Sequence, residues 1–171
     1  MPSVIVWAMA MVVMMAESVL LEVFAAPGWA VQTPIAIAIY LGLDRDFVSG
    51  GLILLALLLP VEWMVGGMYG VYSLGLVAVF FAMCTLRANL QTQWGVARAI
   101  VVAMAVPLHS VVMLAVLFLA GESGGRVTAL IGVHMWTAIP LVVVVTMVMG
   151  RGFARLEKMM DSRGGRPGLE F

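Results

Sequence analysis

The sequence predicts an all-α integral membrane protein, a compact bundle of about six transmembrane helices with both termini on the cytoplasmic side. Hydrophobic residues make up 64% of the chain and charged residues only 11%, whereas an ordinary soluble domain carries roughly a quarter charged residues. Apolar stretches of about 20 residues, each long enough to cross a hydrocarbon core of roughly 30 Å, recur along the chain. The basic residues gather on one side of these stretches, and this asymmetry sets the expected orientation.

The apolar stretches follow one another along residues 1–150, which we expect to form one transmembrane domain. The first stretch is too long for a cleaved signal peptide and lacks a basic start, so we expect it to remain as a helix. The charged turn "DRD" at 44–46 divides the second stretch from the third. The predicted helices cover about residues 4–24, 29–43, 47–65, 69–86, 95–120 and 127–149.

The distribution of lysine and arginine predicts which side of the membrane each connection faces. With both termini in the cytoplasm, only Arg126 falls on the outer side. Because cytoplasmic loops of membrane proteins carry the excess of basic residues, the opposite orientation is excluded. The basic residues on the inner side are Arg45, Arg87, Arg98, Arg151, Arg155, Lys158, Arg163 and Arg166.

Residues 151–171 form the one long polar segment and are predicted to be a basic cytoplasmic tail. Arg151, Arg155 and Lys158 would share one face of a continuing helix and could lie against anionic headgroups. The other interpretation is a stop-transfer anchor followed by a disordered end rich in glycine, arginine and proline.

No catalytic signature is present in the sequence. It contains no glycine-rich phosphate loop, no histidine pair at metal-binding helical spacing and no nucleophile elbow. The single cysteine, Cys84, excludes an intrachain disulfide and a cysteine-based metal cluster. We therefore expect no enzymatic activity, no metal, no cofactor and no nucleic-acid partner.

Four ionisable residues inside the predicted membrane spans fall at one level, and a charge inside a membrane is costly and marks a functional site by default. Counting 1.5 Å per residue along each helix places Glu17, Glu62, His109 and His134 at one level, roughly 20 Å above the cytoplasmic ends. They predict either an outward-facing polar pocket, or a hydrogen-bond network that joins helices. Alternatively, each group is satisfied by its own backbone carbonyl, hydroxyl or water.

Glu62 is distinguished by the glycines that follow it in "PVEWMVGGMYG". Gly66 and Gly70 have the spacing of a small-residue helix contact, but with Gly67 they are expected to form the outer turn of a hairpin. A carboxylate one turn before that bend could accept hydrogen bonds from freed backbone N–H groups and hold the hairpin in shape.

The stretch from about residue 29 to 93 resembles the MreD family, small multi-helix membrane proteins of the bacterial rod-shape system. The resemblance lies in a helix ending in a charged turn ("YLGLDRDFVSGG"), an apolar helix leading to an acidic residue ("LALLLPVEW"), and a glycine-bearing turn before an apolar helix closed by arginine ("GGMYGVYSLGLVAVFFAMCTLR"). The family usually has aspartate at the position of Glu62 and glycine at that of Leu58.

The resemblance to MreD implies a multi-pass protein of the bacterial inner membrane, a non-enzymatic scaffold of the elongasome that helps regulate cell shape. The implied partners are an MreC-like bitopic protein, a RodA-type polymerase with its transpeptidase and, indirectly, MreB-type filaments. Through these partners, peptidoglycan synthesis would be coupled to the cytoskeleton.

A second interpretation stays open. A bundle of about six short helices with a polar layer also resembles the small substrate-binding component of energy-coupling-factor vitamin transporters, in which Glu17, Glu62, His109 and His134 would line a ligand pocket. The AxxxA-type surface common in that family does not occur among Ala8, Ala10 and Ala16 of the first helix. A small intramembrane enzyme would require a catalytic pair, such as Glu17 with His109, on neighbouring helices.

Overall fold

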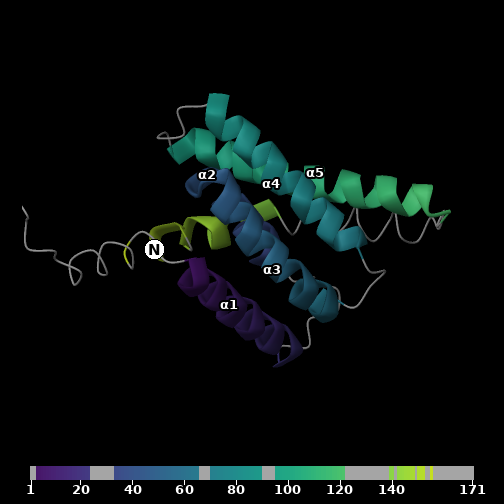
Figure 1. Ribbon diagram of the computed structural model, residues 1–171, viewed down its shortest axis with the longest axis horizontal. Coiled ribbons are helices and arrows are strands. Elements are labelled where there is room, and N and C mark those ends of the chain that lie inside the picture. Colours follow the sequence, from purple (N-terminus) through teal and green to yellow (C-terminus); the bar gives the residue numbers. More distant parts are fainter. Residues whose placement is uncertain are drawn as a thin grey trace, which may run out of the picture.

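The computed structural model describes residues 3–23, 33–65, 70–89, 95–121, 139–140, 142–148, 150–152 and 155 (Figure 1). All regular structure within these ranges is helical, and no strand occurs among the described residues. Short helical pieces lie at 139–140, 142–148, 150–152 and 155. The long helices are α1 (Ser3–Val23), α2 (Thr33–Asp44), α3 (Phe47–Val65), α4 (Val71–Asn89) and α5 (Gly95–Leu119).

These bounds agree closely with the predicted ones for α1, α3 and α5, where apolar runs begin and end abruptly. Helix α4 ends at Asn89 rather than near residue 86. Helix α2 is described from Thr33 onward, so residues 29–32 of the predicted second span lie outside the described part. Helical residues at 150–152 continue past the predicted end near 149.

Two of the described helices are long and apolar enough to cross a membrane by length and composition. They cover 47–64 in α3 and 99–119 in α5. Shorter apolar helical stretches occur in α1, α2 and α4 and at 142–152. The expected bundle of six spans is therefore present only in part within the described residues.

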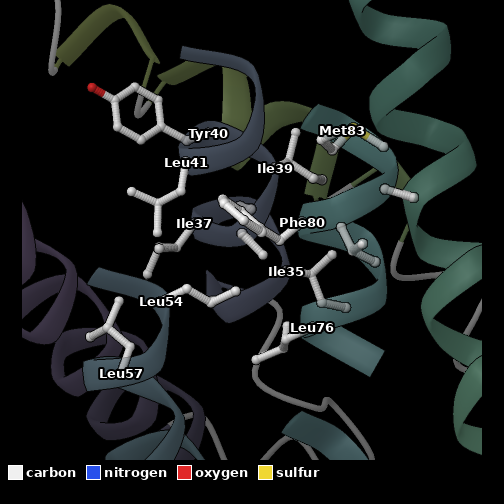
Figure 2. Packing of buried hydrophobic residues seen from close by; sticks show 14 of the residues in the cluster. Ile35, Ile37, Ile39, Tyr40, Leu41, Leu54, Leu57, Leu76, Phe80 and Met83 are labelled. Atoms are coloured by element: carbon white, nitrogen blue, oxygen red, sulfur yellow. The ribbon is translucent and has the colours of Figure 1, made fainter. Parts of the chain in front are cut away.

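Helix α2 lies at the centre of the helices and contacts α1, α3, α4 and α5. Every residue from Thr33 to Leu43 is buried, so none of its faces is left for solvent or lipid. Its isoleucines lie between Leu54 and Leu57 of α3 on one side and the side chains of α4 on the other (Figure 2). The α4 side chains in this core include Leu76, Phe80 and Met83.

The most extensive helix contact joins α2 to α4 and depends on Gly42. A Cβ atom at Gly42 would lie 2.6 Å from Cβ of Met83 and 2.9 Å from the carbonyl oxygen of Phe80. Further along, the Arg87 guanidinium at the end of α4 donates a hydrogen bond to the Arg45 carbonyl just after α2. Since later residues of α2 meet later residues of α4, the two helices run parallel and begin at the same end of the bundle.

A proline inside α3 explains a contact with α1. Pro60 has no N–H group, so the carbonyl of Ala56, four residues earlier, loses its helical hydrogen-bond donor. The indole Nε1 of Trp7 in α1 donates to this carbonyl at 3.4 Å. The hydrogen bond therefore joins α1 to α3 at the point where the α3 backbone is interrupted.

We expect Trp7→Phe to lower the free energy of unfolding in detergent by about 1 kcal/mol, because the Ala56 carbonyl loses its donor. In a Pro60→Ala background, the backbone N–H group gained at position 60 supplies that carbonyl, and the cost of Trp7→Phe should shrink. Thermal unfolding of the two single variants and the double variant measures the coupling. An equal cost of Trp7→Phe in both backgrounds would refute this role for the indole.

The turn between α2 and α3 is held by an N-cap. Asp46 accepts hydrogen bonds from the backbone N–H of Ser49 at 2.9 Å and from its hydroxyl at 2.5 Å. The Ser49 hydroxyl, and then its backbone N–H, hold the pKa of Asp46 below its ordinary value of 3.8. Because the folded pKa is lowered, this cap stabilises the protein above the ordinary carboxyl pKa and is lost as the pH falls through the lowered one.

We therefore expect Asp46→Ala to lower the unfolding temperature at neutral pH, and the gap from wild type to narrow below about pH 3.8. Asp46→Asn, which keeps an uncharged acceptor, is the control and should stay close to wild type at neutral pH. The measurement is thermal unfolding across a pH series. A gap for Asp46→Ala that is constant with pH would contradict a charged cap.

Candidate functional site

Glu62 caps the beginning of the next helix. It lies one turn before the end of α3 and is only 7% exposed. Its Oε1 atom accepts a hydrogen bond from the backbone N–H of Ser73 at 2.8 Å. Ser73 is in the first turn of α4, where backbone N–H groups have no partner within the helix. This is the kind of bond to a freed backbone group that the sequence suggested.

Gly70 supplies the bend that makes this cap possible. Its φ angle of 91° lies in the left-handed region that favours glycine, and its carbonyl accepts a hydrogen bond from Leu74 at 3.0 Å. A Cβ atom at Gly70 would meet nothing within 4 Å. Gly70 therefore serves the turn rather than a close helix contact, while Gly66 and Gly67 lie outside the described residues.

Glu17 makes the same kind of cap on α2. Its Oε2 atom accepts a hydrogen bond from the backbone N–H of Thr33, the first residue of α2, at 3.0 Å. Helices α2 and α4 run parallel, and Gly42 lies beside Met83. Counting the same number of residues back along both helices places Thr33 opposite Leu74, which follows Ser73. Two carboxylates thus face two helix N-termini at one level. A negative charge there is favoured by the helix dipole.

Tyr72 links both carboxylates to α5. Glu17 and Glu62 both act electrostatically on its buried side chain, and its ring meets that of His109 edge-on, with centroids 4.6 Å apart. Three of the four ionisable residues expected at one level therefore lie around Tyr72, while His134 lies outside the described residues. We call this group the polar cluster: Glu17, Thr33, Glu62, Tyr72, Ser73 and His109.

Gly75 makes room for the histidine of the polar cluster. A Cβ atom there would lie 2.6 Å from Cδ2 and 2.8 Å from Nε2 of His109, so α4 presents bare backbone to the imidazole ring. No separate signal in the sequence marks Gly75 or Tyr72, because their role requires α4 and α5 to be neighbours.

A groove opens beside the polar cluster, between the end of α3 and the beginning of α4. Its volume is about 650 Å³. Glu62 and Ser73 contribute its polar groups, and its other lining residues are Leu58, Leu59, Pro60, Trp63 and Gly70. Among the described residues, no group of three or more His, Cys, Asp or Glu side chains could hold a metal ion.

The basic residues of the predicted tail are described in part. Arg151 and Arg155 are helical and exposed, whereas Lys158 lies outside the described residues. Both arginines are therefore accessible to a surface or partner.

No family model, curated protein or solved structure matches this chain. The class of protein defined by the described residues is an all-helical one with two helices apolar enough to cross a membrane.

Proposed function

We propose that this chain is a multi-pass protein of the bacterial inner membrane with about six spans and both termini in the cytoplasm. The support is the apolar outer surface of the helices. Large side chains are exposed on α1, α3, α4 and α5, which only an apolar solvent would favour over so wide an area. Examples are Val4 at 72%, Leu59 at 82%, Phe81 at 51% and Phe118 at 75% exposed.

The charges support the proposed orientation. Asp44 is the last residue of α2, Arg45 and Asp46 follow it, and Arg87 lies in the last turn of α4. These charged groups therefore share one end of the bundle, which we assign to the cytoplasm because basic residues collect there. The carboxylates of the polar cluster lie towards the opposite end, where α2 and α4 begin.

Within that membrane, we propose a non-enzymatic scaffold of the wall-elongation complex that helps couple peptidoglycan synthesis to the cytoskeleton. One observation carries the scaffold role: both Glu17 and Glu62 bind backbone N–H groups of neighbouring helices. They are used to hold helix ends together, and the adjoining groove is open and largely apolar. This favours a structural role over a vitamin pocket or an acid–base pair.

The choice of complex is supported by the MreD-like segment, which contains α2, α3 and α4. Of these helices, α2 is the buried centre of the described structure, and α3 and α4 pack against it. The partners in this proposal are an MreC-like bitopic protein and a RodA-type polymerase with its transpeptidase, and MreB-type filaments are reached through them.

The test is a purification of the tagged full-length protein from its own membranes in mild detergent, with co-purifying proteins identified by mass spectrometry. Recovery of a bitopic coiled-coil protein with a polymerase and transpeptidase is the expected result. Recovery of paired ATPases with a coupling membrane subunit would instead identify a transporter component and overturn the proposal. An unrelated membrane protein of similar abundance, tagged in the same way, controls for adventitious recovery.

A further inference from the structure

The groove beside Glu62 has two hydrogen-bonding side chains, Glu62 and Ser73, in an otherwise apolar lining. The Ser73 side chain is 9% exposed, and its buried Oγ has no hydrogen-bond partner among the described residues. Glu62 uses Oε1 for the Ser73 backbone N–H, and its carboxyl group has a second oxygen that can accept. A buried hydroxyl is costly to leave without a hydrogen bond. The second Glu62 oxygen is therefore complementary to a side chain that donates a hydrogen bond, and the Ser73 hydroxyl can accept from or donate to the same side chain.

The apolar rim of the groove continues along the whole of α3. This rim is a row of exposed apolar residues at intervals of four, three, four and four residues. The spacing is close to that of the residues by which one helix packs on another. Each member is at least 61% exposed, and the last two also line the groove. The row consists of Val48, Leu52, Leu55, Leu59 and Trp63.

The depth of the acceptors favours a helix over a lipid headgroup. Glu62 lies three residues before the end of α3, so it is roughly one turn below that end. A lipid amine stays at the level of the headgroups, whereas a side chain on a neighbouring helix can place a donor at any depth. Helices in a membrane also associate through such hydrogen bonds.

We propose that this groove docks an apolar transmembrane helix of a partner protein, which presents a Ser, Thr, Asn, Lys or Arg side chain to Glu62 and Ser73. The inference rests on the proposed scaffold function and specifies where on the scaffold a partner binds. The apolar row of α3 packs along the partner helix, and the two acceptors fix its register.

The experiment places a photo-crosslinking amino acid at position 59 of the full-length protein in its own membranes. The matched control places it at Met104 on α5, which is 63% exposed and does not line the groove. We expect position 59 to give one discrete protein adduct that position 104 does not give. The cross-linked peptide, identified by mass spectrometry, should lie in an apolar segment with a donor side chain within about one turn.

Ser73→Ala separates docking from folding. It keeps the backbone N–H that Glu62 accepts and removes only the unpartnered hydroxyl, so the unfolding temperature should stay the same or rise slightly. The adduct at position 59 should fall by about threefold, the effect of one interhelical hydrogen bond in a membrane. Glu62→Gln, which replaces one acceptor oxygen by an amino group, is a second variant and should also lower the adduct.

Adducts with lipid alone or a second copy of this chain alone would overturn the inference. A partner segment without a donor, an absent adduct, or an adduct unchanged in both variants would overturn it as well.

The docking groove and the proposed complex can be refuted independently of each other. A donor-bearing helix from a protein outside wall elongation would support the docking groove and overturn the proposed complex. Normal recovery of the elongation proteins without the adduct would support the complex and overturn the groove.

Discussion

Replacing Gly42 with alanine is expected to lower the free energy of unfolding by about 3 kcal/mol, at the upper end of the usual cost of overpacking a core. The added methyl group would lie 2.6 Å from Cβ of Met83 and 2.9 Å from the Phe80 carbonyl oxygen. Neither atom is the far end of a flexible side chain, so α2 and α4 have to move apart. Thermal unfolding in detergent measures the loss.

Gly51→Ala is the matched control for this prediction. Gly51 is also a helical glycine that faces α4, but its added Cβ atom would lie 3.8 Å from the nearest Phe80 ring atom, an ordinary contact. Alanine also has the better helix propensity, so Gly51→Ala should be neutral or slightly stabilising. Equal unfolding temperatures for the two variants would show that α2 and α4 are not closely packed at Gly42.

Glu62→Leu is expected to cost about 1–3 kcal/mol of stability, because the buried backbone N–H of Ser73 loses its acceptor. Glu62→Gln keeps an acceptor oxygen at the same reach and should lose much less. The same comparison applies to Glu17, whose carboxylate binds the Thr33 N–H. Thermal unfolding of Glu62→Leu, Glu62→Gln and Glu17→Leu in one detergent gives the result.

Local opening should distinguish a capping role from a general packing role. Hydrogen exchange at the beginning of α4 should rise in Glu62→Leu, whereas exchange at the beginning of α2 should rise in Glu17→Leu. An unchanged unfolding temperature for Glu62→Leu, with unchanged exchange at α4, would refute the cap.

The helices and the role of Glu62 were accessible to sequence reasoning because their signals are local. The bounds of α3 follow from an apolar run between a charged turn and a glycine-rich segment. Glu62 and its N–H partner at Ser73 belong to consecutive helices joined by a short turn, so a carboxylate before glycines was enough to suggest a bond to freed backbone.

The remaining features of the polar cluster depend on which helices are neighbours, and one sequence does not show this. The meeting of Tyr72, Gly75 and His109 requires α5 to pack on α4. Gly42 carried no signal of its own, because a glycine in an apolar run is equally compatible with a close contact and with a lipid-facing position. Depth counting did group Glu17, Glu62 and His109, since it requires only helix bounds.

The enclosure of α2 has a consequence for biosynthesis. During translation, α1 and α2 leave the ribosome before α3, α4 and α5, yet α4 makes the most extensive contact with α2. A nascent chain that ends before α4 therefore exposes Gly42 and the core-facing isoleucines of α2, and it lacks the Arg87 side chain that binds the Arg45 carbonyl. We therefore expect such a chain to be more easily degraded than the full-length protein until α4 arrives.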